Sequence, residues 1–234
     1  KYVAFADKCW PAFPSQFGFD LHVNSRLVSR GIPVSCEVDI YGALSEYIGI
    51  CASGDTVTLL DINNSVPKYI YDEDISGKFD YKLTDTFMGF HCGNTPACKM
   101  CGDRAVKYQL IQHRLLEPAH DPDFTRGTLE AILPPLNHLL RLQCDSEGQL
   151  RSYNRRGRDP AVATRSFGGI AIFAIPEMCR FYRHVLIQKR SRTTRGAFGH
   201  YGKTLFEVLK FFGIADIAYN QPKSLPYPTE NPFA

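Results

Sequence analysis

Residues 37–61 read EVDIYGALSEYIGICASGDTVTLLD and hold the clearest succession of helix and strand signals in the chain. Asp39 is a favourable N-cap, and apolar residues recur at helical spacing over residues 40–52. A Ser-Gly-Asp turn around Gly54 ends this helix, and strand-forming residues follow over 56–60. The stretch therefore predicts a helix, a tight turn and a returning strand, which together form an α/β unit.

Two carboxylates stand at the ends of this unit, Glu37 before the helix and Asp61 after the strand. A helix of about 13 residues at 1.5 Å each and a strand of about six at 3.3 Å each both span about 20 Å. Glu37 and Asp61 are therefore expected at the same end, where α/β sheets bind ligands. Paired carboxylates repel unless a cation intervenes, and oxygen ligands suit Mn²⁺ or Mg²⁺. The alternative is a carboxylate favouring the helix dipole and an Asp–Asn turn after a strand.

Two histidines offer a further metal ligand. His91 follows the predicted strand 86–90 and precedes Cys92-Gly93-Asn94. His200 follows Gly196-Ala197-Phe198-Gly199 and precedes Tyr201 and a predicted helix. A histidine at a glycine-flanked strand end is a candidate ligand, and a core or capping histidine is the alternative. The sequence does not rank His91 and His200.

Cysteines provide a competing constellation. Cys98 and Cys101 form a CxxC pair, and Cys92 and His91 lie just upstream, so a Cys₃His zinc site is an alternative. The remaining cysteines stand alone, and a lone cysteine behaves as a small hydrophobe. Because no export signal opens the sequence, we expect reduced thiols and a cytoplasmic location.

The rest of the chain becomes richer in strands. Strands are predicted at 86–90, 106–115, 127–133 and 169–175, a hairpin at 139–153, and helices at 177–188 and 203–212, before a proline-rich tail at 221–234. We therefore expect a mixed α+β and α/β protein with two parts, residues 1–61 and residues 62–234. The first part carries the metal carboxylates, and the second is mainly β with two helices and an extended tail.

The composition and net charge of the chain limit the classes of partner that it is expected to bind. The chain has 234 residues, 44% hydrophobic and 22% charged, with a net charge of +3. Such a small charge favours neither nucleic acid nor a membrane surface as the main partner, and no apolar run is long enough to span a bilayer. Basic residues cluster around 151–158 and 189–195, where a solvated face is the expected structure and a phosphate or an acidic neighbouring subunit is the alternative.

Several motifs resemble one known family. They are Asn24-Ser25-Arg26-Leu27, Gly31-Ile32-Pro33-Val34, residues 36–44, Leu59-Leu60-Asp61 with Asn63, Gly89-Phe90-His91-Cys92-Gly93-Asn94, Thr125-Arg126-Gly127, Phe173-Ala174-Ile175-Pro176-Glu177 and Phe198-Gly199-His200. Together they resemble the L-fucose isomerase and L-arabinose isomerase-like proteins. The resemblance implies a Mn²⁺-dependent aldose–ketose isomerase that works through a cis-enediol.

The resemblance also assigns roles to residues. It implies that Glu37 and Asp61 are both metal ligands and the acid–base pair, that His200 or His91 completes the metal site, and that Mg²⁺ or another divalent ion could replace Mn²⁺. We expect Asn63, His91, Asn94 and Tyr201 to contact a monosaccharide. Relatives carry a histidine pair where this chain reads Ser191-Arg192-Thr193-Thr194-Arg195, so the histidine ligand stays open.

Family organisation sets further expectations. Relatives have additional α/β domains before the region that matches Lys1, and their sites lie between domains and often between subunits. We therefore expect this chain to correspond to the end of a Rossmann-like middle domain and a β-barrel-like carboxy-terminal domain, to depend on absent amino-terminal α/β domains, and to form a homo-oligomer. A catalytically inactive sugar-binding or regulatory homologue is the alternative function.

Overall fold

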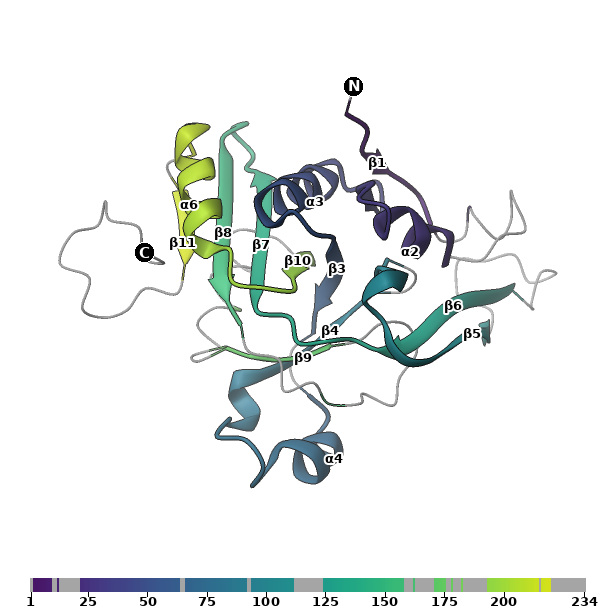
Figure 1. The fold of residues 1–234 in the computed structure, drawn as a ribbon. Helices are drawn as coiled ribbons and strands as arrows, with labels where there is room; N and C mark the ends of the chain where they lie inside the picture. Colours follow the sequence, from purple (N-terminus) through teal and green to yellow (C-terminus); the bar gives the residue numbers. More distant parts are fainter. Residues whose placement is uncertain are drawn as a thin grey trace.

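The computed structural model describes residues 2–9, 12, 22–63, 66–91, 94–111, 124–157, 162, 171–175, 178, 182, 193–214 and 216–219. Its helices are α2 (His22–Val28), α3 (Ile40–Ser53), the short α4 (Lys68–Ile70), which continues into a π-helical turn (Tyr71–Ile75), and α6 (Gly202–Phe211), with 3₁₀ turns at Leu83–Asp85 and Ala97–Lys99. Its strands are β1 (Phe5–Ala6), β2 (Val34–Ser35), β3 (Val57–Ile62), β4 (Thr86–Phe90), β5 (Cys101–Ile111), β6 (Phe124–Ile132), β7 (His138–Cys144), β8 (Leu150–Arg156), β9 (Ala171–Ala174), β10 (Thr193–Ala197) and β11 (Asp216–Tyr219). The protein is thus a mixed α and β structure (Figure 1).

A seven-stranded sheet organises the described residues, in the order β11-β8-β7-β10-β3-β4-β9. The β11–β8 pair is parallel, and the other neighbours are antiparallel. Strands β1 and β2 form a separate parallel pair, and β5 and β6 form a long antiparallel ribbon. Strand β3 therefore lies inside the main sheet, with β10 on one side and β4 on the other.

Helix α3 covers one face of this sheet. It packs against β7 and β10 and also contacts α6 (Figure 1). Asp39 caps its first turn by accepting a hydrogen bond from the Gly42 backbone N–H at 2.9 Å, and Gly54 ends it in a left-handed conformation. A carboxylate cap of this kind contributes about 0.5–2 kcal/mol to helix stability.

Alternation along β3 decides which side chains face α3. A Cβ on Gly49 of α3 would touch Val57 and Leu140, so Val57 lies on the α3 side of the sheet. Because successive residues of a strand point to opposite faces, Leu59 and Asp61 share that side with Val57. Leu60 points the other way, into the main core cluster with Phe87, Leu139, Tyr153 and Phe173.

Local signals located most of these elements. The predicted helices at 40–52 and 203–212 and the strand 86–90 are confirmed within one residue, and the hairpin 139–153 is confirmed with a second strand that ends three residues later, at Arg156. The predicted helix at 177–188 and the tail at 221–234 fall mostly or wholly outside the described residues. The expected division after residue 61 falls inside β3, which is hydrogen-bonded on both sides to strands of the later part.

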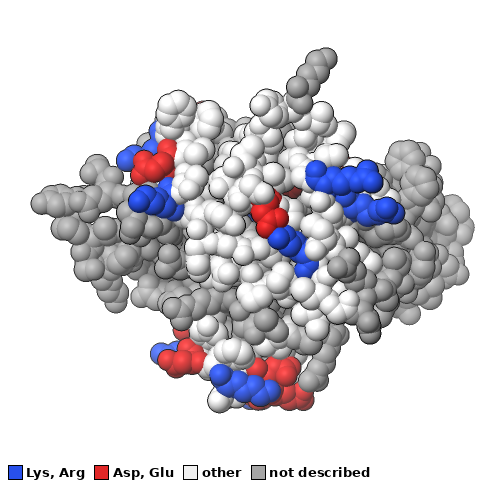
Figure 2. Space-filling model, in the orientation of Figure 1, with Lys and Arg blue, Asp and Glu red and all other residues white. Residues whose placement is uncertain are grey.

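The seven-stranded sheet is open, with β11 and β9 at its edges, and no closed barrel occurs among the described strands. None of the helices in the described ranges combines the length and the apolar character needed to cross a membrane. On the face shown in Figure 2, positive and negative side chains lie together around α4, where Lys68 pairs with Asp72 and Lys78 with Asp74.

Candidate functional site

The site begins with Asp61 and His91, which lie on neighbouring strands. Asp61 is in β3, and His91 directly follows Phe90, its partner in β4. The His91 Nδ1 atom lies 3.5 Å from Asp61 Oδ2, and the side chains are 4% and 31% exposed respectively. Asp61 is thus reachable from solvent, whereas the imidazole lies almost completely inside the protein.

The N-terminal end of α3 meets this end of β3. Asp61 is directly opposite Thr193 of β10, so both side chains lie on the α3 side of the sheet. The Thr193 hydroxyl donates to Asp39 Oδ2 at 3.3 Å, and Asp39 is the N-cap of α3. One threonine therefore joins the strand that carries Asp61 to the helix start that follows Glu37.

Glu37 occupies an unusual turn between β2 and α3. Glu37 and Val38 have φ angles of 65° and 58°, values that side chains with a Cβ rarely adopt. Both side chains are exposed, and the Val38 N–H donates to the Asp7 carbonyl at 2.7 Å. Strained backbone of this kind costs about 1–3 kcal/mol per residue and concentrates at functional sites. The turn therefore presents the Glu37 carboxylate at an energetic cost.

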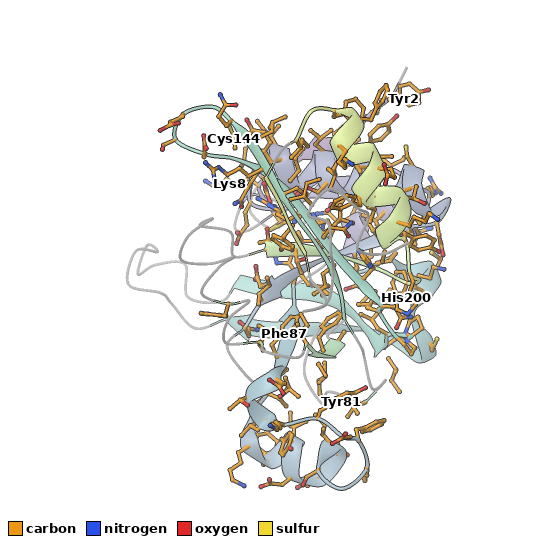
Figure 3. The ribbon with its side chains drawn as sticks, turned by 90° about the vertical axis from the view of Figure 1, so that its left-hand side faces the viewer. Tyr2, Lys8, Tyr81, Phe87, Cys144 and His200 are labelled. Carbon is orange, nitrogen blue, oxygen red and sulfur yellow. A yellow bond between two sulfur atoms is a disulfide. The ribbon has the colours of Figure 1, made fainter. Side chains whose placement is uncertain are left out.

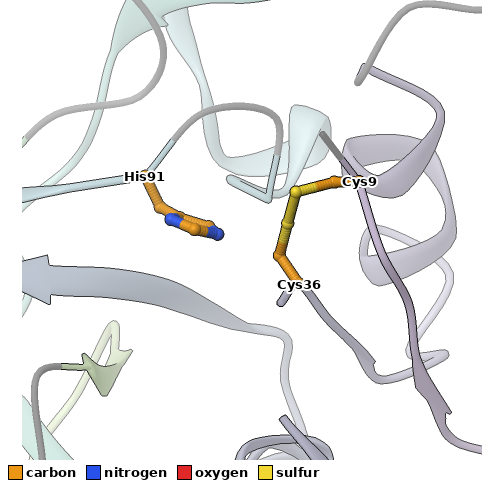
Figure 4. A group of neighbouring side chains, drawn as sticks. All are labelled: Cys9, Cys36 and His91. Carbon is orange, nitrogen blue, oxygen red and sulfur yellow. A yellow bond between two sulfur atoms is a disulfide. The ribbon is translucent and has the colours of Figure 1, made fainter. Parts of the chain in front are cut away.

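A disulfide joins the two segments that flank this turn. Cys9 and Cys36 are bonded, with Cα atoms 5.7 Å apart, and both are buried. The expectation of reduced thiols is therefore wrong for this pair, because β1 runs beside β2 and brings the segment that follows β1 close to Cys36. Their sulfurs and one His91 ring nitrogen all lie within 4.8 Å of one another (Figure 4).

Polar residues surround the disulfide. Asn24 donates to Asp7 Oδ2 at 2.8 Å and to Asn94 Oδ1 at 3.1 Å, and Asn94 donates to the Val34 carbonyl. Burial raises the pKa of Asp7, although the hydrogen bond from Asn24 and the nearby His91 act in the opposite direction. Asn94 is fully buried, so its amide ties α2 to β2 at the back of the site instead of facing a substrate from an open surface.

A buried ionic network anchors the start of α3. Arg195 is 0% exposed and lies 3.2 Å from Glu46 Oε1 and 3.3 Å from Asp39 Oδ2. It also donates to Ser35, and Arg141 donates to Asp39 at 2.8 Å. The expectation of a solvated face is therefore wrong for Arg195, because β10 occupies the centre of the sheet and points this side chain at α3.

Burial and charge shift the pKa values in this network. Burial raises the pKa of Glu46 to about 8, and the charge of Arg195 limits the rise. Burial alone would raise the pKa of Asp39, but its hydrogen bond from Arg141 and the charge of Arg195 hold it below the usual value. Burial lowers the pKa of Arg195 itself. Asp39 is thus the permanent anion of the network, and Glu46 is the group that titrates.

His200 and Tyr201 lie at the other end of the sheet from Asp61. Thr193 pairs with Asp61, and Ala197 pairs with Val57. The four residues from Thr193 to Ala197, at 3.3 Å each, therefore carry β10 about 13 Å away from Asp61 before the chain reaches His200. Figure 3 shows His200 well separated from Cys144, which belongs to the Thr193 end of β7. The chain therefore brings His91 to Asp61 and does not bring His200 there.

The remaining predicted site residues have simple positions. Asn63 follows β3 on the Asp61 side and is exposed, with its N–H bonded to the Met88 carbonyl at 3.1 Å. Cys98 and Cys101 are exposed free thiols. Within the described residues, the one three-residue group of metal-ligating atoms is Cys9, Cys36 and His91, so it contains neither of these cysteines and neither Glu37 nor Asp61. Cys92 lies outside the described residues.

Sequence reasoning missed several residues of this site. It treated Cys9 and Cys36 as unrelated and placed Arg195 on the surface. The available signal for Arg195 was its setting in Thr-Thr-Arg-Gly-Ala, where small and strand-forming neighbours indicate a buried strand. Pairing of Cys9 with Cys36 carries no local signal, because the two are separated by 27 residues.

No protein-family model matches this chain, and the search of curated proteins finds no match either. Function is therefore inferred from the chemistry of the site and from the motif resemblance.

Proposed function

We propose that this chain carries the metal and acid–base carboxylates of an aldose–ketose isomerase. One observation carries the proposal: Asp61 is linked on two sides to the residues that flank Glu37. His91 lies between Asp61 and the sulfur of Cys36, and Thr193 lies between the strand position of Asp61 and Asp39. Both carboxylates thus belong to one end of the sheet, as the isomerase chemistry requires.

The donor set suits a hard divalent cation. Glu37 and Asp61 supply carboxylate oxygens and His91 supplies an imidazole nitrogen, a combination that favours Mn²⁺ over softer metals. The partial exposure of Asp61 leaves access for a substrate, and Glu37 is exposed. We assign His91 as the histidine ligand, because His200 of the same chain follows the far end of β10. Mg²⁺ is the natural substitute for Mn²⁺ at such a site.

When bound, the metal ion acts as a Lewis acid that polarises the O1 and O2 oxygens of an open-chain sugar. The protein's own groups then move the proton. One carboxylate of the Glu37–Asp61 pair removes the proton from C2 of the aldose, which leads to a cis-enediol. The other carboxylate then returns a proton to C1. Such positioned proton transfer contributes about 10²–10⁴-fold to a rate. The imidazole of His91 fixes the orientation of Asp61.

The substrate class follows from the same chemistry. A free aldose of the L-fucose, D-arabinose or L-arabinose type offers adjacent O1 and O2 oxygens to the metal. Asn63, which follows β3 beside Asp61, is placed to contact a further hydroxyl. The proposal also carries the family organisation with it: amino-terminal α/β domains, a Rossmann-like middle domain, a β-barrel-like carboxy-terminal domain and a homo-oligomer whose subunits could supply Tyr201 or His200.

Metal binding and turnover test the proposal separately. Binding of Mn²⁺ is followed by the loss of the free-ion electron paramagnetic resonance signal, and ketose formation is measured on a panel of aldoses before and after chelation. Glu37→Gln and Asp61→Asn are each expected to weaken Mn²⁺ binding and to lower turnover at least about 100-fold.

Glu147→Gln is the matched control, because Glu147 is an exposed glutamate in the β7–β8 turn. It should change neither measurement. Turnover that survives complete chelation would refute the mechanism. Sugar and Mn²⁺ binding without any ketose, in the full-length protein, would instead identify a binding or regulatory homologue.

A further inference from the structure

The Cys9–Cys36 disulfide is buried close to the imidazole of His91. The His91 side chain is only 4% exposed, and its Nε2 atom is buried and has no hydrogen-bond partner among the described residues. An unpaired buried imidazole nitrogen costs about 1–3 kcal/mol. Figure 4 shows the ring pointing toward the Cys9–Cys36 disulfide. In the oxidised protein this nitrogen therefore points at the disulfide without a hydrogen-bond partner among the described residues.

We propose that reduction of the Cys9–Cys36 disulfide creates a zinc site formed by the two sulfurs and His91. The three ligand atoms already lie within 4.8 Å of one another, so they can converge on one ion without rearranging the strands that carry them. Thiolate and imidazole ligands together favour Zn²⁺, which binds sulfur at about 2.3 Å and nitrogen at about 2.0 Å. This set differs from the oxygen-rich donors at Glu37 and Asp61.

Asp61 completes the second shell of this zinc site. Its carboxylate faces Nδ1, the nitrogen opposite the proposed ligand Nε2. Metal-ligating histidines commonly have a carboxylate on their other nitrogen, which fixes the tautomer and the ring orientation. A His91 arranged in this way presents a lone pair on Nε2 toward the sulfurs.

Charge balance also fits a buried zinc site. Two thiolates and a neutral imidazole cancel the charge of Zn²⁺, so no net charge is placed among residues that are nearly inaccessible to water. The fourth position of a tetrahedral site is left for water, which can donate to Asp7 Oδ1, an atom that is also buried and has no hydrogen-bond partner among the described residues. Asp7 lies close enough to His91 for their charges to interact.

The chemistry is a two-electron reduction followed by metal binding. A dithiol reductant gives two electrons and two protons to the Cys9–Cys36 bond and becomes a disulfide itself. Zn²⁺ then displaces the two thiol protons into water as the Zn–S bonds form. Access to the bond requires only local opening of β1, a two-residue strand in which Phe5 is 48% exposed and which follows Val3, 54% exposed.

Cobalt and zinc binding to the oxidised and reduced protein test the proposal. The full chain is reduced with a phosphine, which takes the oxygen of one water molecule while the two sulfurs take its protons, and excess reagent is removed. The reduced protein should then bind one more Co²⁺ or Zn²⁺ per chain than the oxidised protein, with the thiolate-to-cobalt charge-transfer band and the visible bands of tetrahedral cobalt. The oxidised protein should show neither band.

Variants assign the ligands. His91→Ala and Cys36→Ser should abolish the tetrahedral cobalt spectrum, and Asp61→Asn should weaken zinc binding about 10–100-fold. A double variant, Cys98→Ser with Cys101→Ser, is the matched control, because it removes two exposed thiols and should leave the spectrum unchanged. Loss of the spectrum in this control with retention in Cys36→Ser would overturn the proposal.

X-ray absorption at the zinc edge of the reduced wild-type protein needs no variant. It should show two sulfur neighbours and at least one imidazole, and a shell of oxygen and nitrogen alone would refute the site. Neither measurement involves turnover, so failure of the isomerase proposal leaves this result intact. Conversely, Mn²⁺-dependent turnover in a protein that binds no zinc after reduction would refute only the zinc site.

Discussion

Replacement of Arg195 by Met tests whether the buried network anchors the start of α3. Arg195 is fully buried, and its guanidinium contacts Glu46, Asp39, Ser35 and Thr193. Removing one member of a buried ion pair costs about 3–5 kcal/mol because the other charge is left without compensation. Asp39 retains Arg141, and Glu46 with its pKa of about 8 is already protonated at pH 6, so we expect the lower end, about 3 kcal/mol at pH 6.

The pH dependence gives this prediction its sharpest form. In the folded protein the pKa of Glu46 is about 8, above its unfolded value. The stability that this raised pKa contributes is fully present below the unfolded pKa. As the pH rises toward 8, the free energy of unfolding falls by about 1.4 kcal/mol per pH unit. Without Arg195 the pKa of Glu46 rises further, so the variant continues to lose stability above pH 8. The difference from wild type should grow by about 1 kcal/mol between pH 8 and pH 9, because Glu46 of the wild type is still half protonated at pH 8 and loses its remaining proton over the same interval.

Urea unfolding of both proteins at pH 6, 8 and 9 measures the effect. The double variant Arg195→Met, Glu46→Gln is the control, because it has no titrating group at position 46. Its difference from the Glu46→Gln single variant should stay constant over this range. A destabilisation below about 1 kcal/mol at pH 6 that is also flat with pH would show that Arg195 is not buried between two carboxylates.

Three further changes probe the structure around the site. Gly42→Ala should lower the free energy of unfolding by about 1–3 kcal/mol in a urea titration, because its Cβ would collide with the Arg195 guanidinium and with Asp39. Cys9→Ala with Cys36→Ala should lower it by up to about 3.5 kcal/mol for a separation of 27 residues, and chemical reduction of the wild type should give the same midpoint. Val38→Gly should leave stability unchanged or raise it by up to about 1 kcal/mol, because φ is 58° there, whereas Leu44→Gly in α3 should cost about 1 kcal/mol; a comparable loss at both positions would contradict the strained turn.

The sequence predicted the parts of the fold that depend on local signals. The cap at Asp39, the apolar spacing over 40–52 and the left-handed Gly54 located α3, and the turn after residue 144 located the β7–β8 hairpin. Each of these signals lies within a few residues of the element it defines. The common end of α3 and β3 was predictable for the same reason, because two adjacent elements of equal length must return to their starting point.

Non-local pairings were not predictable in this way. Nothing near Arg195 in the sequence reveals that β10 lies between β7 and β3, which is what buries its side chain. The parallel pairing of β11 with β8 joins residues more than 60 positions apart, for example Asp216 with Arg151. The position of His200 depends on the direction of β10 relative to β3, and a strand signal carries no direction.

The Cys9–Cys36 disulfide and the buried network of Arg195, which the sequence did not predict, explain how the strained turn at Glu37 persists. A non-glycine pair at positive φ persists only where the surrounding structure holds it more firmly than the strain opposes it. On one side, the disulfide fixes Cys36 to Cys9; on the other, Asp39 is held by Arg141 and Arg195. Between them the Asp7 carbonyl accepts the Val38 N–H. The backbone of the turn that carries Glu37 is therefore held on both sides, so breaking either the disulfide or the contacts of Asp39 with the two arginines should allow the turn to relax.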